Sequence, residues 1–236
     1  ALANPLANGE AGLRLSGIVG RVDYALSYFY THEDVGTLDS LVVPPGFTPV
    51  FSSRVIRDLV AYANQTGQEI RLLHDEQHIY GAEFETTLSS FGLRGDFAYT
   101  SDVSYTTVQL QRVRKPVFQY MVGADYNGPG AFYLNVQFGQ AYIDDFEDTI
   151  ILARELTSNI NGTISKGFFN EDLKVEFRWF YDFDGDGTLY NPKFIVNYWP
   201  NVTLELGLEV FDGTDANPLG FYRDNDQGYV LVEWKF

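Results

Sequence analysis

Hydrophobic and polar residues alternate one by one over long stretches of this chain, most clearly in its last nine residues. Alternate side chains of a β-strand point to opposite faces. One face of segment 228–236 therefore carries Val230, Val232, Trp234 and Phe236. The opposite face carries Tyr229, Leu231, Glu233 and Lys235. The pattern predicts a strand with one apolar face and one mixed, charged face.

The same period of two recurs along the chain and predicts about eleven strands joined up and down. The predicted strands are 13–19, 24–31, 70–90, 96–105, 118–126, 132–142, the two arms of a hairpin over 156–182, 193–198, 202–210 and 228–236. Turn-forming residues predict tight turns near 20–23, 92–95, 127–130, 169–172 and 200–201. Residues 111–116 predict a basic loop, with Arg112, Arg114 and Lys115.

The segment 33–69 breaks this rhythm. It predicts a long loop that contains a short helix at 55–63. A structureless loop of this length is uncommon in a compact domain unless it has a function. We therefore expect an extracellular or inserted loop over, or into, the mouth of a barrel, where it would form the constriction.

Two features favour a membrane barrel over a soluble sandwich. Several predicted strands sustain the alternation for about nine or more residues, the length that crosses a bilayer at a tilt. The charged residues of the strong strands also share the face opposite the apolar one. We expect these side chains to line a pore: Glu83, Glu85, Asp102, Asp125, Lys174, Glu176, Arg178, Glu205, Glu209, Glu233 and Lys235. Acids outnumber bases among them, which predicts a mild preference for cations.

Composition adds exclusions. The formal net charge of −16 argues against binding to a phosphate backbone, so no nucleic-acid partner is expected. The chain contains no cysteine, which excludes disulfides and thiolate metal sites. No run of 18 apolar residues predicts a transmembrane helix, but each strand of a membrane barrel needs only about ten alternating residues.

Short motifs spread over the chain resemble an uncharacterised, porin-like family of bacterial outer-membrane proteins whose members are longer. The resembling segments are 8–14, 22–28, 122–126, 134–138 and 223–226. The terminal strand Val230–Phe236 also resembles the C-terminal signal strand of outer-membrane barrels. This resemblance implies a channel or transporter in a Gram-negative outer membrane, with some relatives associated with hydrophobic cargo. It also implies that Val230–Phe236 is recognised by the barrel-assembly machinery.

The fold prediction is therefore an all-β, antiparallel up-and-down transmembrane β-barrel, with residues 1–236 in a single domain and about 11–12 strands visible. If the C-terminus is periplasmic, the last of eleven strands runs toward the periplasm, and so does the first. The N-terminus would then lie on the outer side, after an odd number of strands, whereas bacterial single-chain barrels have even numbers. We expect these residues to be the C-terminal part of a larger barrel, with a missed strand within 33–69 as the alternative. Membrane lipids are expected partners, and a homo-oligomer is compatible with the pattern.

Two further motifs match metal-binding patterns incompletely. Asp182, Asp184 and Asp186 match the start of a calcium loop, but Lys193 occupies the position of its bidentate acid, so a plain hairpin loop is favoured. His74 and His78 fall on one face, but Asp75 holds the position of the glutamate in the metalloprotease motif, which favours a solvated strand rim. No other cofactor is expected.

The predicted function is a porin-like channel for passive or facilitated transport of small solutes or hydrophobic compounds, and not an enzyme. One alternative is a soluble or surface β-sandwich that binds carbohydrate or protein. The other is an outer-membrane enzyme that acts on lipid through His74 or His78.

Overall fold

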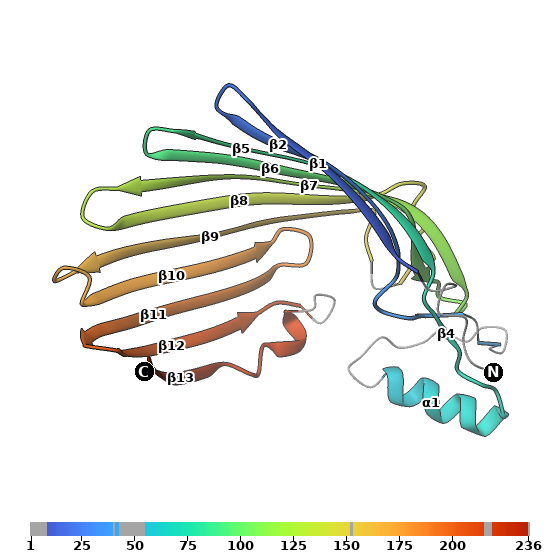
Figure 1. Ribbon diagram of the computed structural model, residues 1–236. Coiled ribbons are helices and arrows are strands. Elements are labelled where there is room, and N and C mark those ends of the chain that lie inside the picture. The colour runs from blue at the N-terminus through green and yellow to red at the C-terminus, as the bar shows by residue number, and fades with distance from the viewer. Residues whose placement is uncertain (1–8, 40, 43–54, 152, 215–218, 236) are drawn as a thin grey trace.

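A single antiparallel sheet dominates the fold (Figure 1). The computed structural model describes residues 9–39, 41–42, 55–151, 153–214 and 219–235. Eleven strands pair with their neighbours in chain order: β1 (Ala11–Val19), β2 (Val22–His32), β5 (Glu76–Leu88), β6 (Phe91–Thr106), β7 (Arg112–Gly128), β8 (Phe132–Ile143), β9 (Leu156–Phe168), β10 (Leu173–Asp182), β11 (Gly187–Trp199), β12 (Val202–Asp212) and β13 (Gln227–Trp234). The all-β, up-and-down antiparallel prediction is confirmed.

The remaining elements are short. β3 (Thr37–Leu38) pairs with β4 (Leu72–Leu73) in a separate two-stranded sheet. The helix α1 (Val55–Thr66) confirms the helix expected at 55–63, and a 3-10 turn, η1 (Gly220–Tyr222), precedes β13. Within the described ranges, no helix is long and apolar enough to cross a membrane.

Connections of two kinds lie at opposite ends of the sheet (Figure 1). Tight turns join β1 to β2, β5 to β6, β7 to β8, β9 to β10 and β11 to β12 at what we call the turn end. Longer connections, including 33–75 and 144–155, lie at the opposite, loop end. The expected alternation of short and long connections is confirmed except between β10 and β11, where segment 183–186 is as short as the turn at 169–172.

Three local predictions are wrong. The segment 92–95 is not a turn but lies inside β6, and the chain reverses at Ser89 and Ser90, where Ser89 has a φ of 60°. The basic segment 111–116 is not a loop, because β7 begins at Arg112, which pairs with Thr106. The strand expected over 70–90 is interrupted between β4 and β5.

The two glycines that suggested a turn at 92–95 serve close packing instead. A Cβ atom on Gly95 would lie 2.3 Å from the ring of Phe84 on the paired strand, and one on Gly92 would lie 2.6 Å from the Asp125 carboxylate. Gly162 is similarly covered by the ring of Trp179, its direct partner on β10. Aromatic rings that cover a facing glycine fix the pairing of two strands, because a shift by one residue would remove the fit.

The sheet is open, so the closed barrel expected from the sequence does not form within the part of the chain that the structure describes. β1 and β13 are the two ends of the strand order, and each has one partner. Every successive pair is antiparallel, and eleven strands therefore place β1 and β13 in the same direction. A direct junction of β1 with β13 would be parallel, which explains why these strands alone do not complete an antiparallel barrel.

A small apolar cluster forms at the loop end rather than across the sheet. Leu41, Ala63 and Leu110 are buried against each other, with Leu38 and Tyr62 packed around them. Leu110 belongs to the connection between β6 and β7, so the described part of 33–69 is anchored there. Residues 40 and 43–54 of that segment lie outside the described residues.

Candidate functional site: the polar face of the sheet

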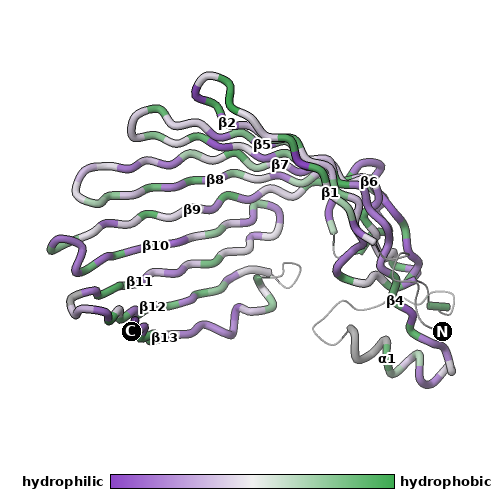
Figure 2. The backbone as a smooth tube through the Cα atoms, in the orientation of Figure 1, coloured by the Kyte–Doolittle hydropathy of each residue, from purple (hydrophilic) through white to green (hydrophobic). Residues whose placement is uncertain are grey.

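Hydrophobic and hydrophilic residues alternate along many of the strands (Figure 2), and strand register shows which of them share a face of the sheet. One row of paired residues runs from Asp23 through Glu85, Arg94, Gly123, Gln137, Asn161, Phe180 and Leu189 to Phe211. Residues at even spacing from this row share its face, which we call the polar face; the other is the apolar face. This row also contains Phe180, Leu189 and Phe211, so the predicted separation of charged and hydrophobic residues is present but incomplete on β10, β11 and β12.

Ten of the eleven expected pore-lining residues lie on the polar face by this register. They are Glu83, Glu85, Asp125, Lys174, Glu176, Arg178, Glu205, Glu209, Glu233 and, directly after β13, Lys235. Asp102 is the exception, because it falls within the register shift between Thr100 and Val103, where regular alternation is interrupted.

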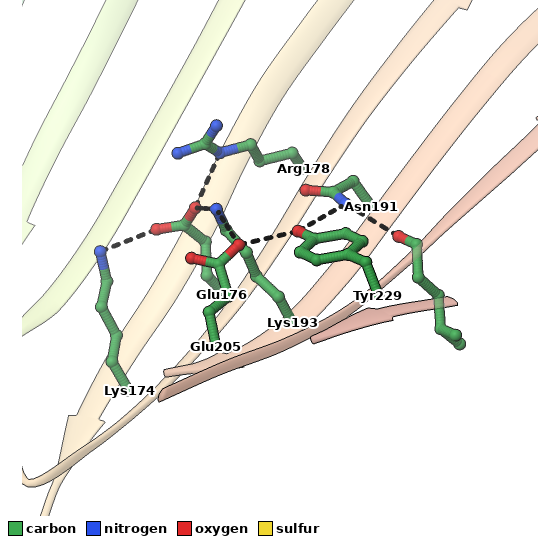
Figure 3. Close-up of polar contacts among 8 residues, drawn as sticks. Lys174, Glu176, Arg178, Asn191, Lys193, Glu205 and Tyr229 are labelled. Carbon is green, nitrogen blue, oxygen red and sulfur yellow. Dashed lines mark hydrogen bonds and ion pairs between the residues drawn. The ribbon is translucent and has the colours of Figure 1, made fainter. Parts of the chain in front are cut away.

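One cluster on β10, β11 and β12 is built around a buried carboxylate (Figure 3). Glu176 accepts contacts from Lys174 Nζ at 2.7 Å, Arg178 Nε at 2.7 Å and Lys193 Nζ at 3.4 Å. Lys193 Nζ also lies 3.3 Å from Glu205 Oε1. We call these five residues the basic patch, because three cations surround two acids. Glu176 is almost fully buried, and each of its two carboxylate oxygens forms an ion pair with a cation of the patch.

Tyr229 connects the basic patch to the last strand. Its hydroxyl donates to Glu205 Oε1 at 2.8 Å, and Asn191 Nδ2 lies 3.4 Å from the same hydroxyl. The phenol ring lies over Gly207, where a Cβ atom would be 2.4 Å from it. The glycine thus allows the aromatic side chain to lie across β12 and reach the carboxylate of Glu205.

A second cluster lies on β1, β2, β5, β6 and β7. Arg14 pairs with Glu83, and Arg94 Nη2 lies 2.5 Å from Asp125 Oδ1. Asp23, Glu85 and Asp96 are exposed beside these pairs. We call these seven residues the acidic patch, because five acids accompany two arginines. All of them except Asp125 line one open hollow of about 650 Å³.

The two patches are separated by an uncharged strip. On the polar face, β8 and β9 carry amides and hydroxyls, including Asn135, Gln137, Asn159, Asn161 and Thr163. β7 and β10 are three strand spacings apart, which corresponds to about 14 Å along the sheet. The polar face therefore presents two distinct charged regions rather than one mixed surface.

The sequence analysis did not select Arg14, Arg94, Lys193 or Tyr229 as site residues. All four share the face of the selected acids by register. The alternation in the sequence therefore predicts the face on which these four residues lie. Which cation meets which acid depends on register between strands, as for Lys193 and Glu176, which are direct cross-strand partners.

The apolar face is exposed and has no second layer among the described residues. Leu206 is 41% exposed, Val230 67% and Trp234 71%. Two rows of aromatic rings mark this face. Near the loop end, Tyr28, Tyr80, Tyr99 and Phe118 follow one another with centroid distances of 4.8–6.1 Å. Near the turn end, Phe91, Tyr126 and Phe132 do the same at 4.8 and 6.2 Å.

The two aromatic rows are separated by the same number of residues on neighbouring strands. On β6 they are eight residues apart, from Phe91 to Tyr99, and on β7 from Phe118 to Tyr126. Eight residues span about 26 Å along a strand, and a tilt of about 40° reduces this to roughly 20 Å. Aromatic girdles of membrane barrels flank an apolar band about 25 Å tall.

A polar cluster at the loop end ties the segment before β5 to the β6–β7 hairpin. Ser104 Oγ donates to Asp75 Oδ2 at 2.5 Å, and Arg112 pairs with the same carboxylate. Burial raises the pKa of Asp75, but the hydrogen bonds from Ser104 and Arg112 and the charges of Arg112 and Arg114 outweigh it. The pKa of Asp75 is therefore lowered from its ordinary value.

The histidines make contacts that suit structural roles. His74 Nδ1 lies 2.7 Å from the backbone oxygen of Glu33, and His78 Nδ1 lies 2.8 Å from the hydroxyl of Tyr28. His78 stacks beside Tyr28 in the loop-end aromatic row. The Oγ atom of Ser101 accepts from the backbone N–H of His78 at 3.3 Å, and not from its ring. Hydrolysis through either histidine stays a prediction.

The three aspartates of the β10–β11 loop have separate hydrogen-bond partners. Asp182 accepts from the backbone N–H of Asp184, Asp184 from the backbone N–H of Ser158, and Asp186 from the hydroxyl of Tyr181. In the described part of the chain, no three His, Asp or Glu side chains are grouped closely enough to hold a metal ion. Calcium binding at this loop stays a prediction from the sequence.

No model of a known protein family matches this chain, and no curated protein is significantly similar to it.

Proposed function

We propose that this chain forms part of the wall of a porin-like channel in a bacterial outer membrane, for passive or facilitated passage of small solutes or hydrophobic compounds. The observation that carries the proposal is the exposed apolar face, bordered at both ends by aromatic rings, on a sheet whose other face is charged. Soluble monomers rarely expose contiguous apolar patches of more than a few hundred Å². Acyl chains would cover this face, and water in the lumen would solvate the polar one.

Strand length supports the same proposal. The strands of the large sheet are 8–17 residues long, whereas about 9–11 residues cross a bilayer at a tilt. In a β-sandwich, a second sheet would cover the apolar residues. The only other sheet among the described residues is the two-stranded β3–β4 pair, which leaves a soluble binding module without a core.

A spanning sheet must be closed, because unpaired backbone groups are costly in hydrocarbon. Since β1 and β13 run in the same direction, an antiparallel wall requires an odd number of further strands between them. A second copy in the same membrane orientation would also meet either edge in parallel. We therefore propose that this sheet is part of a larger barrel.

The free edge of β13 also supports a role in assembly. We propose that the barrel-assembly machinery recognises Val230–Phe236, of which Phe236 lies outside the described residues. The face with Val230, Val232 and Trp234 is exposed, and the edge opposite β12 has no strand partner. Both features leave the described part of this strand accessible to a partner protein.

Conductance and partitioning test the channel proposal. The full-length protein that contains this sheet should partition into detergent, shift its gel mobility on heating and conduct in planar bilayers, with a reversal potential that favours cations. Partitioning into the aqueous phase without detergent, together with no heat-dependent shift, would instead select the soluble β-sandwich. Loss of a lipid-hydrolysing activity on substitution of His74 or His78 would select the enzyme.

A further inference from the structure

The two charged patches differ in the charge that a solute would meet. In the basic patch the side chain of Glu176 is only 4% exposed and that of Lys193 9%, whereas Arg178 is 56% and Lys174 40% exposed. The second acid, Glu205, is 20% exposed, so the two most exposed members of the patch are both cations. The accessible charge of the basic patch is therefore positive, although the chain as a whole is strongly acidic.

The guanidinium of Arg178 is hydrogen-bonded at Nε and exposed at its two terminal nitrogens. Its Nε atom donates to Glu176 Oε1 at 2.7 Å, which fixes the plane of the guanidinium. The two terminal nitrogens form no hydrogen bond or ion pair with the described residues, and in Figure 3 they point away from Glu176 and Lys193. A guanidinium in this state presents two parallel N–H donors, the geometry that matches a planar carboxylate.

We propose that the basic patch is a binding subsite for the carboxylate group of an anionic solute, which is held by the terminal nitrogens of Arg178 with Lys174 beside it. Glu176 and Lys193 are positioning residues, because they orient the two exposed cations without facing the solute themselves. The inference deepens the proposed channel function, on which it rests for its biological role.

The acidic patch provides an internal comparison. Arg14 is as exposed as Arg178, at 57%, and is likewise paired with one glutamate, Glu83. It differs in its surroundings, because the exposed carboxylates of Asp23, Glu85 and Asp96 line the same hollow. These acids would repel an anion at the distances where Arg14 would attract it. Arg14→Gln therefore removes the same charge from an equally exposed site without removing a carboxylate subsite.

Succinate binding to the full chain folded in detergent tests the subsite. We expect calorimetric titration to detect succinate binding, which Arg178→Gln weakens about tenfold, the loss of roughly one charge-assisted hydrogen bond. Arg178→Lys should retain part of the affinity, because it keeps the charge but loses the planar fork. Arg14→Gln should stay within about twofold of the parent. An unchanged heat-dependent gel shift would show that each variant is folded.

Two results would overturn the subsite: no succinate binding by the folded parent chain, or equal weakening by Arg14→Gln and Arg178→Gln. The titration does not require a closed pore. Succinate binding through Arg178, together with no conductance by the full-length protein, refutes the channel and retains the subsite. Conductance without succinate binding refutes the subsite alone.

Discussion

The acidic patch and the basic patch are built on the same face of the same sheet, yet they use charge differently. In the basic patch, three cations enclose Glu176, and the exposed groups are positive. In the acidic patch, two arginines pair with Glu83 and Asp125, while three further acids stay exposed. From the net charge of the chain alone, the whole polar face would be expected to be negative. Burial within each cluster decides which sign a solute meets.

The largest expected effect separates the two patches by stability. Glu176→Gln leaves three cations around a neutral amide, and removing one partner from a buried ion cluster costs about 3 kcal/mol. Glu83→Gln breaks an exposed pair and should cost less than about 1 kcal/mol. Urea unfolding in detergent micelles measures both. Equal losses would mean that Glu176 is solvated in the folded protein.

A smaller effect concerns the packing of β9 against β10 on the apolar face. A methyl group at Gly162 would lie 2.3 Å from the Trp179 ring and 2.5 Å from the backbone oxygen of Asn135. Because the backbone cannot move aside as a side chain can, Gly162→Ala should cost about 2 kcal/mol in the same unfolding assay. The control is Gly228→Ala, whose nearest neighbour is a side-chain carbon of Leu208 at 3.3 Å. Equal stability of the two variants would contradict the close strand pairing.

The polar cluster around Asp75 at the loop end provides a third site, and its contribution to stability depends on pH. The folded pKa of Asp75 is lowered from its ordinary value of 3.8, so the carboxylate stabilises the fold above that pH. This stabilisation is lost as the pH falls through the folded pKa. Asp75→Asn should cost about 1 kcal/mol at neutral pH. The difference from the parent should disappear in strong acid, and a difference independent of pH would assign the effect to packing instead.

The smallest expected effects are on ion selectivity, and they have opposite signs in the two patches. Glu85→Gln should lower the cation-to-anion permeability ratio about twofold, and Arg178→Gln should raise it by a similar factor, since each removes about one exposed charge near the ion path. Reversal potentials in a salt gradient measure both. A shift in the same direction for both variants would show that the patches do not act separately.

Alternation was sufficient to predict the two faces, because the side-chain period of a strand is two whatever its partner. It placed Glu176, Glu205 and Glu233 on one face and Trp179, Leu206 and Trp234 on the other, as the register does. The glycine-rich segment 92–95 misled the turn prediction, because glycine serves both turns and close contacts with aromatic rings. The bulge at Asp102 also leaves no signature in the alternation.

Pairing inside the patches could not be predicted in the same way. Lys193 and Glu176 are far apart in sequence and become neighbours only through the register of β10 on β11. Register depends on turn geometry and on fits such as Trp179 over Gly162. The sequence therefore predicts which residues face water, and the structure adds which of them neutralise one another.

The central claim is that lipid covers the apolar face, and tryptophan fluorescence tests it most directly. The chain has three tryptophans, and Trp179, Trp199 and Trp234 all lie on the apolar face by register. After folding into vesicles, brominated acyl chains should quench most of this fluorescence, and aqueous iodide should quench little. Strong quenching by iodide, with no effect of bromination, would contradict the account.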